Sequence, residues 1–249
     1  MDVTAIIPAR YASTRFPGKP LVDILGQPMI QRVYAQVVKA RTVNRVIVPT
    51  DDERIAAAVR AFGGQVQLTR ADHATGTDRL AEVAATLDTE LVVNVQGDEP
   101  LIDPEHIDRA VAPLLADAAL PMSTLAAPIE TREDLLNPNV VKVVVTPQGR
   151  ALYFSRAPIP WPRDEMASLP EDLRGRGFWR HIGLYVYRKP FLLEYASWPA
   201  AVLETVEKLE QLRVLERGLP IGVVTVACPA PGVDTPEDLQ KVIRLLRQS

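Results

Sequence analysis

The sequence predicts an α/β fold in which a mostly parallel sheet is flanked by helices, and three observations lead to this expectation. Short apolar runs alternate with stretches that repeat apolar residues at helical spacing. This β-α-β order favours parallel strands with right-handed connections. A chain of 249 residues with 47% hydrophobic content can also bury one substantial core. We therefore expect one domain over residues 1–249.

Each element of the first half has a local reason. The apolar run 3–7 is typical of a buried strand, and Pro8 ends its pairing because proline has no N–H to donate. The next helix repeats apolar residues on one face from Ile30 to Val38. The other elements expected here are a helix at 52–62 closed by Gly63 and Gly64, strands at 45–48, 66–68, 90–95 and 123–129, and helices at 78–87 and from 103.

The second half predicts a less regular arrangement. Strands at 140–145 and 152–155, a proline-rich stretch, a loop at 164–177 and a strand at 181–187 suggest an inserted β-rich region that covers the site. A long helix at 201–217 and a strand at 221–227 follow. Thr235 and Pro236 then begin the last helix. We divide the domain into a mononucleotide-binding half at about 1–130, the insertion at 140–200 and a return to the main sheet at 201–249.

Composition limits the class of protein. The formal net charge of −3 gives no general attraction for nucleic acid or an anionic membrane. The single cysteine, Cys228, excludes a disulfide framework within the chain and is expected to be a small buried apolar residue. No apolar run reaches the 18–20 residues of a membrane span, and the start lacks a basic signal region. We expect a cytoplasmic enzyme or binding protein with no nucleic-acid or membrane partner.

A basic loop follows the first predicted strand. Arg10, Arg15 and Lys19 lie within ten residues, with Ser13 between them and no acid in the stretch. Phosphate oxygens prefer charge-assisted donors, so the loop favours a polyphosphate site. A solvated basic loop is the alternative, but open α/β sheets bind ligands at the carboxyl ends of strands. The proline after Lys19 excludes the usual P-loop spacing.

Two carboxylates are candidate Mg²⁺ ligands. Asp98 follows the strand at 90–95, and Asp234 follows the loop after the strand at 221–227. Both would project from carboxyl edges of strands, where Mg²⁺ bridged by phosphate and carboxylates suits a triphosphate. Simpler explanations are a turn residue for Asp98 and an acid that favours a helix N-terminus for Asp234.

A second set of residues could bind an acidic co-substrate. Arg156 follows one predicted strand, and His181 and Tyr185 share a face of another. Tyr185 could instead be a core aromatic. Arg70 with Thr75 and Gly76 could line a base or ribose pocket, because glycine allows close approach of a ligand. By position alone, Glu210 and Gln211 belong to the solvated face of the long helix.

Several stretches resemble one family. Residues 7–21 resemble the signature of the nucleotide-activating cytidylyltransferases, and more narrowly that of the 3-deoxy-manno-octulosonate (Kdo) cytidylyltransferases, or CMP-Kdo synthetases. Seven further stretches are similar to the same enzymes in the same order: 69–73, 93–100, 137–144, 151–161, 180–185, 209–213 and 232–239.

The resemblance implies a Rossmann-like fold of the nucleotide-diphospho-sugar transferase type, usually dimeric. It implies transfer of CMP from CTP to the anomeric hydroxyl of Kdo, with release of pyrophosphate, for lipopolysaccharide biosynthesis. The site residues that it implies are Arg10, Ser13, Arg15 and Lys19 at the phosphates, Arg70, Thr75 and Gly76 near the cytidine, Asp98 and Asp234 on Mg²⁺, and Gln96, Arg156, His181, Tyr185, Glu210 and Gln211 at the sugar acid, with Arg10, Lys19, Asp98 and Asp234 catalytic.

The sequence leaves two alternatives open. The acid could be a relative of Kdo, such as 8-amino-Kdo or sialic acid, because a few pocket side chains would decide between them. A non-catalytic nucleotide-binding module on the same sheet is the alternative from another class. Such a module would bind CTP without turnover.

Overall fold

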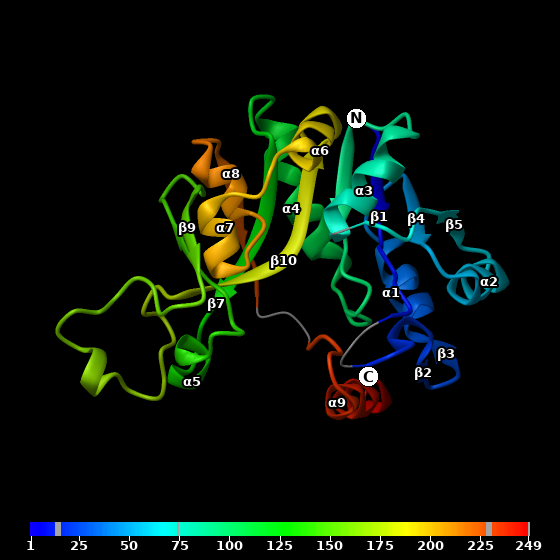
Figure 1. The fold of residues 1–249 in the computed structure, drawn as a ribbon. Helices are drawn as coiled ribbons and strands as arrows, with labels where there is room; N and C mark the ends of the chain where they lie inside the picture. Colours follow the sequence, from blue (N-terminus) through cyan, green and yellow to red (C-terminus); the bar gives the residue numbers. More distant parts are fainter. Residues whose placement is uncertain (13–15, 74, 228–230, 249) are drawn as a thin grey trace.

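One mixed sheet runs through the protein (Figure 1), seen in a computed structural model that describes residues 1–12, 16–73, 75–227 and 231–248. Its main path has the strand order β11-β7-β10-β6-β1-β4-β5, and β8 and β9 join it through β10. The strands are β1 (Val3–Ile6), β4 (Arg45–Thr50), β5 (Gln65–Leu68), β6 (Leu91–Asn94), β7 (Met122–Pro128), β8 (Lys142–Val145), β9 (Ala151–Ser155), β10 (Trp179–Arg188) and β11 (Ile221–Thr225), with a separate hairpin of β2 (Asp23–Ile24) and β3 (Gln27–Pro28).

Most pairings in the main path are parallel, as the sequence predicts. β1 pairs in parallel with β4 and β6, β4 with β5, and β7 with β11. Only β10 runs against its neighbours β6 and β7 in this path of the described chain. The expected α/β class, with a largely parallel central sheet between helices, is therefore confirmed.

The helices form two layers because alternate strand residues face opposite sides of the sheet. Ala5 of β1 joins a core built with α1, α2 and α4, and Ile6 joins another built with α3, α6 and α8. The helices are α1 (Met29–Val37), α2 (Glu53–Ala61), α3 (Gly76–Ala85), α4 (Pro104–Ala116), α5 (Arg132–Leu136), α6 (Lys189–Ser197), α7 (Val202–Glu207), α8 (Leu212–Glu216) and α9 (Pro236–Gln248), with short 3₁₀ turns at Lys19–Leu21 and Met166–Ser168.

The predicted insertion at 140–200 is not separate from the main sheet. Its last strand, β10, lies between β6 and β7, in the middle of the sheet. The hairpin β8–β9 extends from β10 through the pairing of Lys142 with Arg180. The loop at 164–177 packs onto the rest of the domain, because Leu169 and Leu173 share a small core with Ile129, Leu135, Val140 and Phe178. Non-local strand order of this kind is not encoded in local sequence patterns.

The predicted long helix at 201–217 is wrong, because the structure divides it into α7 and α8. Lys208 ends α7 in the left-handed conformation, with φ 55° and ψ 47°. The break lets Glu204 and Arg213 face each other, with Nε–Oε2 and Nη2–Oε1 distances of 2.7 and 2.5 Å. Both residues are buried, so this pair fixes the angle between the two short helices.

The C-terminal helix returns to the N-terminal half of the chain. α9 begins at Pro236, as its capping pattern predicts, and lies beside the β2–β3 hairpin and the start of α1 (Figure 1). Leu239 and Val242 of α9 pack there against Ile24 and Met29. This packing places the segment before α9 next to the loop that follows β1. In the described part of the chain, no helix has the length and apolar character needed to span a membrane.

Replacing Arg213 with methionine should lower the free energy of unfolding by about 3–5 kcal/mol, because Glu204 would keep a buried charge without its partner. Denaturant titration measures this change. The matched control is Arg174→Met, which removes an exposed pair with Asp172 and should cost less than about 1 kcal/mol. Addition of Glu204→Gln to the Arg213 variant should recover part of the loss. Equal stability of the two arginine variants would contradict the assignment.

Candidate active site

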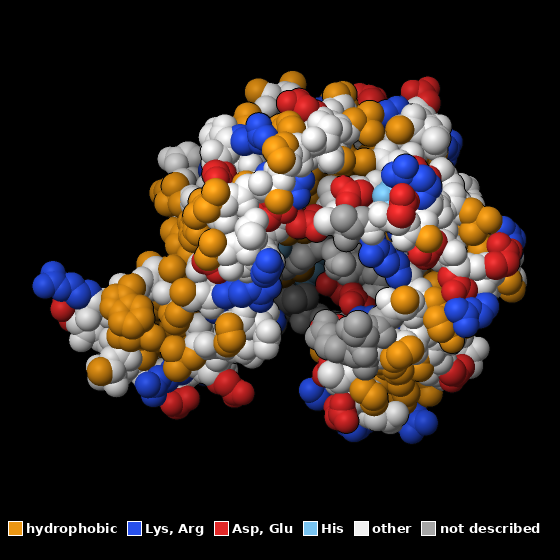
Figure 2. Space-filling view, in the orientation of Figure 1, with side chains coloured by type: hydrophobic (Ala, Val, Ile, Leu, Met, Phe, Trp, Pro, Cys, Tyr) orange, Lys and Arg blue, Asp and Glu red, His pale blue; other side chains and the backbone are white. Residues whose placement is uncertain are grey.

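The candidate site lies at the carboxyl ends of β1 and β6, which are parallel neighbours. Loops from both strand ends therefore reach the same edge of the sheet. In Figure 2 a hollow separates the two halves of the molecule, and acidic side chains show at its floor. Two adjoining hollows can be distinguished there, and Pro8, Gly76 and Gln96 line both of them.

The first hollow is lined by Lys19 and Asp98, among others, and Asp234 contacts the same lysine. Lys19 Nζ lies 2.7 Å from Asp98 Oδ2 and 3.2 Å from Asp234 Oδ1. Gly18 precedes Lys19 in a turn. Its φ of 72° and its position against the Tyr11 ring both favour a residue without a side chain. A backbone bond from Val233 N–H to Asp98 O, 2.8 Å long, joins the two acidic segments. The structure thus brings together three residues from distant parts of the sequence.

The geometry of these carboxylates fits a divalent cation. Asp98 and Asp234 both reach the single position that the Lys19 ammonium holds. No cluster of three or more His, Cys, Asp or Glu side chains suited to a metal is found among the described residues. A cation here would take its remaining ligands from water or a bound phosphate, as Mg²⁺ commonly does.

Arg10 joins the phosphate loop to the start of α3. Its Nη2 donates to Thr75 O at 2.9 Å and to His73 O at 3.4 Å. Thr75 caps α3 in a capping box with Asp78, and Gly76, the first residue of α3, lines both hollows. Arg70 does not line either hollow, and its side chain is exposed beside Asp72. Ser13 and Arg15 lie outside the described residues.

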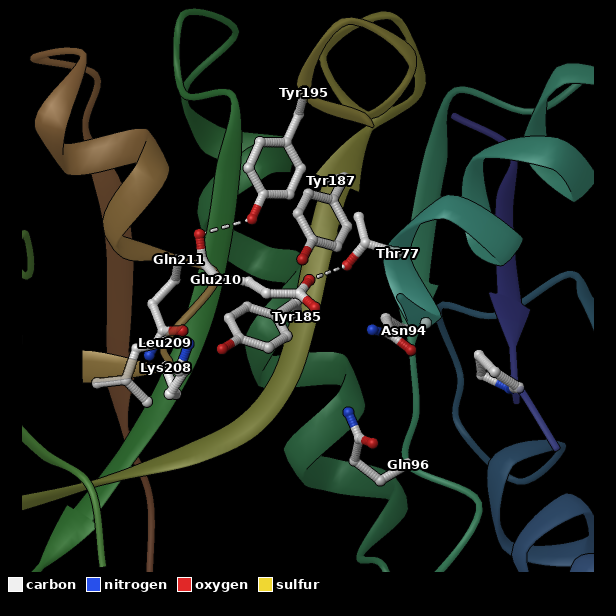
Figure 3. Close-up of a pocket in the computed structure, with 12 residues that line it drawn as sticks. Thr77, Asn94, Gln96, Tyr185, Tyr187, Tyr195, Lys208, Leu209, Glu210 and Gln211 are labelled. Atoms are coloured by element: carbon white, nitrogen blue, oxygen red, sulfur yellow. Dashed lines mark hydrogen bonds between the residues drawn. The ribbon is translucent and has the colours of Figure 1, made fainter. Parts of the chain in front are cut away.

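The second hollow, called the tyrosine pocket below, has a volume of about 300 Å³ and is shown in Figure 3. Tyr185 and Tyr187 enter it from β10, and Tyr195 enters it from α6. Burial raises the pKa of each tyrosine hydroxyl, so all three stay protonated at neutral pH. The full lining is Pro8, Gly76, Thr77, Asn94, Gln96, Tyr185, Tyr187, Tyr195, Lys208, Leu209, Glu210 and Gln211.

Glu210 is held inside the tyrosine pocket by two contacts (Figure 3). Thr77 Oγ1 donates to its carboxylate at 2.6 Å, and the Tyr195 hydroxyl donates to its backbone carbonyl at 2.7 Å. Burial raises the pKa of the Glu210 carboxyl, although the Thr77 hydrogen bond opposes the shift. Glu210 lies between α7 and α8, after the break at Lys208. It therefore lines the tyrosine pocket and does not belong to the solvated face of a long helix, as its position in the sequence had suggested.

Two amide side chains lie in the same pocket. Gln96 Nε2 donates to Gly183 O at 3.0 Å, which fixes this side chain between the two hollows. Gln211 is 4% exposed, and its Nε2 has no hydrogen-bond partner among the described residues. A buried donor without a partner is energetically unfavourable, so this amide is suited to an oxygen of a bound ligand.

His181 lies behind Tyr185 and does not line the tyrosine pocket. Its ring centroid is 5.3 Å from that of Tyr185, consistent with the predicted shared face. Thr124 Oγ1 lies 2.9 Å from His181 Nε2 and 2.8 Å from Leu184 O. The Thr124 hydroxyl thus lies between the His181 ring and backbone carbonyls of β10. Burial lowers the pKa of His181 to about 3, which keeps the imidazole neutral.

Arg156 lies beside the break between α7 and α8. Its guanidinium donates to three backbone carbonyls, those of Glu207 at 2.7 Å, Pro138 at 3.0 Å and Lys208 at 3.4 Å. Arg156 is not among the residues that line the tyrosine pocket. In the structure this side chain therefore stabilises the turn that carries Lys208.

The sequence did not indicate several residues of the tyrosine pocket. Tyr187 could have been found, because it is two residues after Tyr185 on a predicted strand. Tyr195 lies on a helix that the sequence patterns did not reveal, and Lys208 lies at the unpredicted break. Thr77 and Asn94 also line the pocket, and they carry no distinctive signal in the sequence.

Comparison with known proteins identifies the family. A cytidylyltransferase family model matches residues 4–221. A 3-deoxy-manno-octulosonate cytidylyltransferase of Syntrophotalea carbinolica is 60% identical, covering 99% of each chain. Another, of Geobacter sulfurreducens, is 56% identical and covers 99% of this chain and 100% of its own.

A solved structure agrees with these matches. It is described as CMP:2-keto-3-deoxy-manno-octonic acid synthetase complexed with CTP. It has a TM-score of 0.92 and 44% sequence identity, and the match covers 100% of this chain and 99% of that one. The resemblance expected from the sequence is confirmed, and the chain belongs to the cytidylyltransferase family.

Proposed function

We propose that the protein transfers CMP from CTP to the anomeric hydroxyl of Kdo, giving CMP-Kdo and pyrophosphate for lipopolysaccharide biosynthesis. The observation that carries the proposal is the junction of the two hollows. A lysine–carboxylate cluster suited to a metal-bound triphosphate adjoins a polar pocket of the size of a sugar, with Gln96 between them. The names of the full-length relatives and the CTP complex of the similar structure support this reaction.

The phosphate end of the reaction needs positioning and charge neutralisation more than covalent help. We assign phosphate binding to Arg10, Lys19 and the N-terminus of α3, with Ser13 and Arg15 as further members of the same loop. Asp98 and Asp234 would hold Mg²⁺, which supplies neutralisation of the charge on the triphosphate when bound. Lys19 would then move from the two carboxylates to a phosphate oxygen and stabilise charge on the departing pyrophosphate.

The acceptor end is the tyrosine pocket. Gln96, Glu210 and Gln211 offer hydrogen-bond donors and acceptors for the hydroxyls of the sugar acid, and Tyr185 offers a protonated hydroxyl. His181, neutral and behind Tyr185, would act by holding that ring in place. When the pocket holds the anomeric oxygen in line with the α-phosphate, the attack on phosphorus becomes effectively unimolecular. Arg70, Thr75 and Gly76 remain our proposal for the cytidine side.

We also propose how the domain is divided between the two substrates. Residues 1–130 would bind the nucleotide, and β10, within 140–200, would bind the sugar acid. We infer a homodimer, for which the exposed apolar side chains of Leu152, Trp161, Val202 and Val206 are candidate contacts. A cytoplasmic location would suit the use of CTP. Sialic acid and 8-amino-Kdo are the alternative acceptors.

Release of pyrophosphate should require CTP, Kdo and Mg²⁺ together. The measurement is a coupled pyrophosphate assay with each nucleoside triphosphate and with Kdo, 8-amino-Kdo and sialic acid. The expected order of kcat/KM places CTP with Kdo first, and a chelator should abolish turnover because the triphosphate charge would no longer be neutralised. Faster turnover of UTP or ATP with a neutral sugar phosphate would refute the substrate assignment.

Asp98→Asn and Asp234→Asn should each lower kcat by about 100- to 1,000-fold, because each removes one charged ligand from the phosphate end. The Mg²⁺ concentration for half-maximal activity should rise in both variants. The matched control is Asp164→Asn, which removes an exposed carboxylate in the loop beside Arg163. Wild-type kcat and Mg²⁺ dependence in either site variant would show that these carboxylates do not hold the metal.

A further inference from the structure

The tyrosine pocket contains one cationic side chain, Lys208, among its described lining residues. The same lining contains one carboxylate, Glu210, and otherwise neutral groups. An acidic sugar that enters this pocket brings a second negative charge close to Glu210. Placing two carboxylates together in a partly buried site is unfavourable unless a cation accompanies them.

Lys208 has a backbone conformation that lysine rarely adopts. Its φ of 55° and ψ of 47° lie in the left-handed region, which glycine occupies without cost to a Cβ atom. Arg156 holds this turn through the carbonyls of Glu207 and Lys208. Strained residues that a surrounding network holds in place tend to lie at functional sites. The position favours glycine on backbone grounds, and the lysine that occupies it is exposed to solvent at the edge of the tyrosine pocket.

The ammonium group of Lys208 has no hydrogen bond or ion pair with any residue in the described part of the chain. Four other cations of the described chain near the site already have partners. Lys19 contacts two carboxylates, Arg10 and Arg156 contact backbone carbonyls, and Arg213 is paired with Glu204. Figure 3 shows Lys208 at the edge of the pocket near Gln211, whose Nε2 also has no hydrogen-bond partner among the residues that the structure describes.

We propose that Lys208 binds the carboxylate of the acceptor and makes the tyrosine pocket selective for acidic sugars over neutral ones. The Gln211 amide, beside it, is placed to donate to the same carboxylate or a neighbouring hydroxyl. Arg156 acts as a positioning residue, because it holds the turn that directs Lys208. This inference rests on the proposed function and adds to it the residue that recognises the acid group.

The test compares Lys208→Met with Lys208→Gly in the pyrophosphate assay. Methionine keeps the length of the side chain and removes the charge, and glycine removes the side chain while it fits the backbone conformation. Both variants should raise the KM for Kdo about 10- to 100-fold, the range expected for a lost charge-assisted hydrogen bond. The KM for CTP should change less than about threefold, because Arg10 and Lys19 are untouched.

A neutral acceptor gives the second readout. With the carboxamide of Kdo in place of the acid, the wild-type protein should show a much lower kcat/KM. Both Lys208 variants should lose most of this preference, and Lys208→Arg should retain part of it. Lys39→Met, which removes an exposed lysine at the end of α1, is the matched charge control and should keep the wild-type preference.

Several outcomes would overturn the proposal. Unchanged KM for Kdo in Lys208→Gly would show that the side chain is not required, even if the methionine variant were impaired through the turn. An unchanged preference for acid over amide would show that another group reads the carboxylate. In both cases the proposed function would still stand, provided that the wild-type protein turns over CTP and Kdo. Absence of that turnover in the wild-type protein would instead refute the proposed function, and this inference with it.

Discussion

The ammonium group of Lys19 is the contact on which the arrangement of the site depends. It joins the loop after β1 to Asp98 after β6 and to Asp234 before α9, so residues more than 200 positions apart meet at one point. The Asp234 side chain is half exposed, and exposed ion pairs add little to stability. The cluster is therefore better explained by ligand binding, in which Lys19 can pair with a phosphate and the aspartates with a cation, than by a contribution to folding.

The sheet explains how two chemically different hollows come to adjoin. Parallel strands β1 and β6 deliver the cationic and acidic loops at their carboxyl ends. The antiparallel strand β10 lies beside β6, with Tyr185 opposite Asn94, and brings its tyrosines to the same edge. One reversal of strand direction thus places a polar pocket for an acceptor next to a site for phosphates.

Local patterns in the sequence were sufficient where local forces decide the structure. The apolar run of β1, the basic loop after it and the capped start of α9 follow from side-chain chemistry and spacing. The break at Lys208 does not, because the buried pair of Glu204 and Arg213 overrides the helical propensity of 201–217. For the same reason Glu210 was assigned to a solvated face from its position and to the acceptor only from family resemblance.

The meeting of Lys19, Asp98 and Asp234 around a metal-bound triphosphate is the central claim, and a crystal structure with CTP and Mn²⁺ tests it most directly. Mn²⁺ accepts the same hard oxygen ligands as Mg²⁺ and can be located by anomalous scattering. We predict a metal in direct contact with oxygens of both aspartates and of CTP, with Lys19 Nζ moved to a phosphate oxygen. A metal bound away from both carboxylates, with Lys19 still paired to them, would contradict the account.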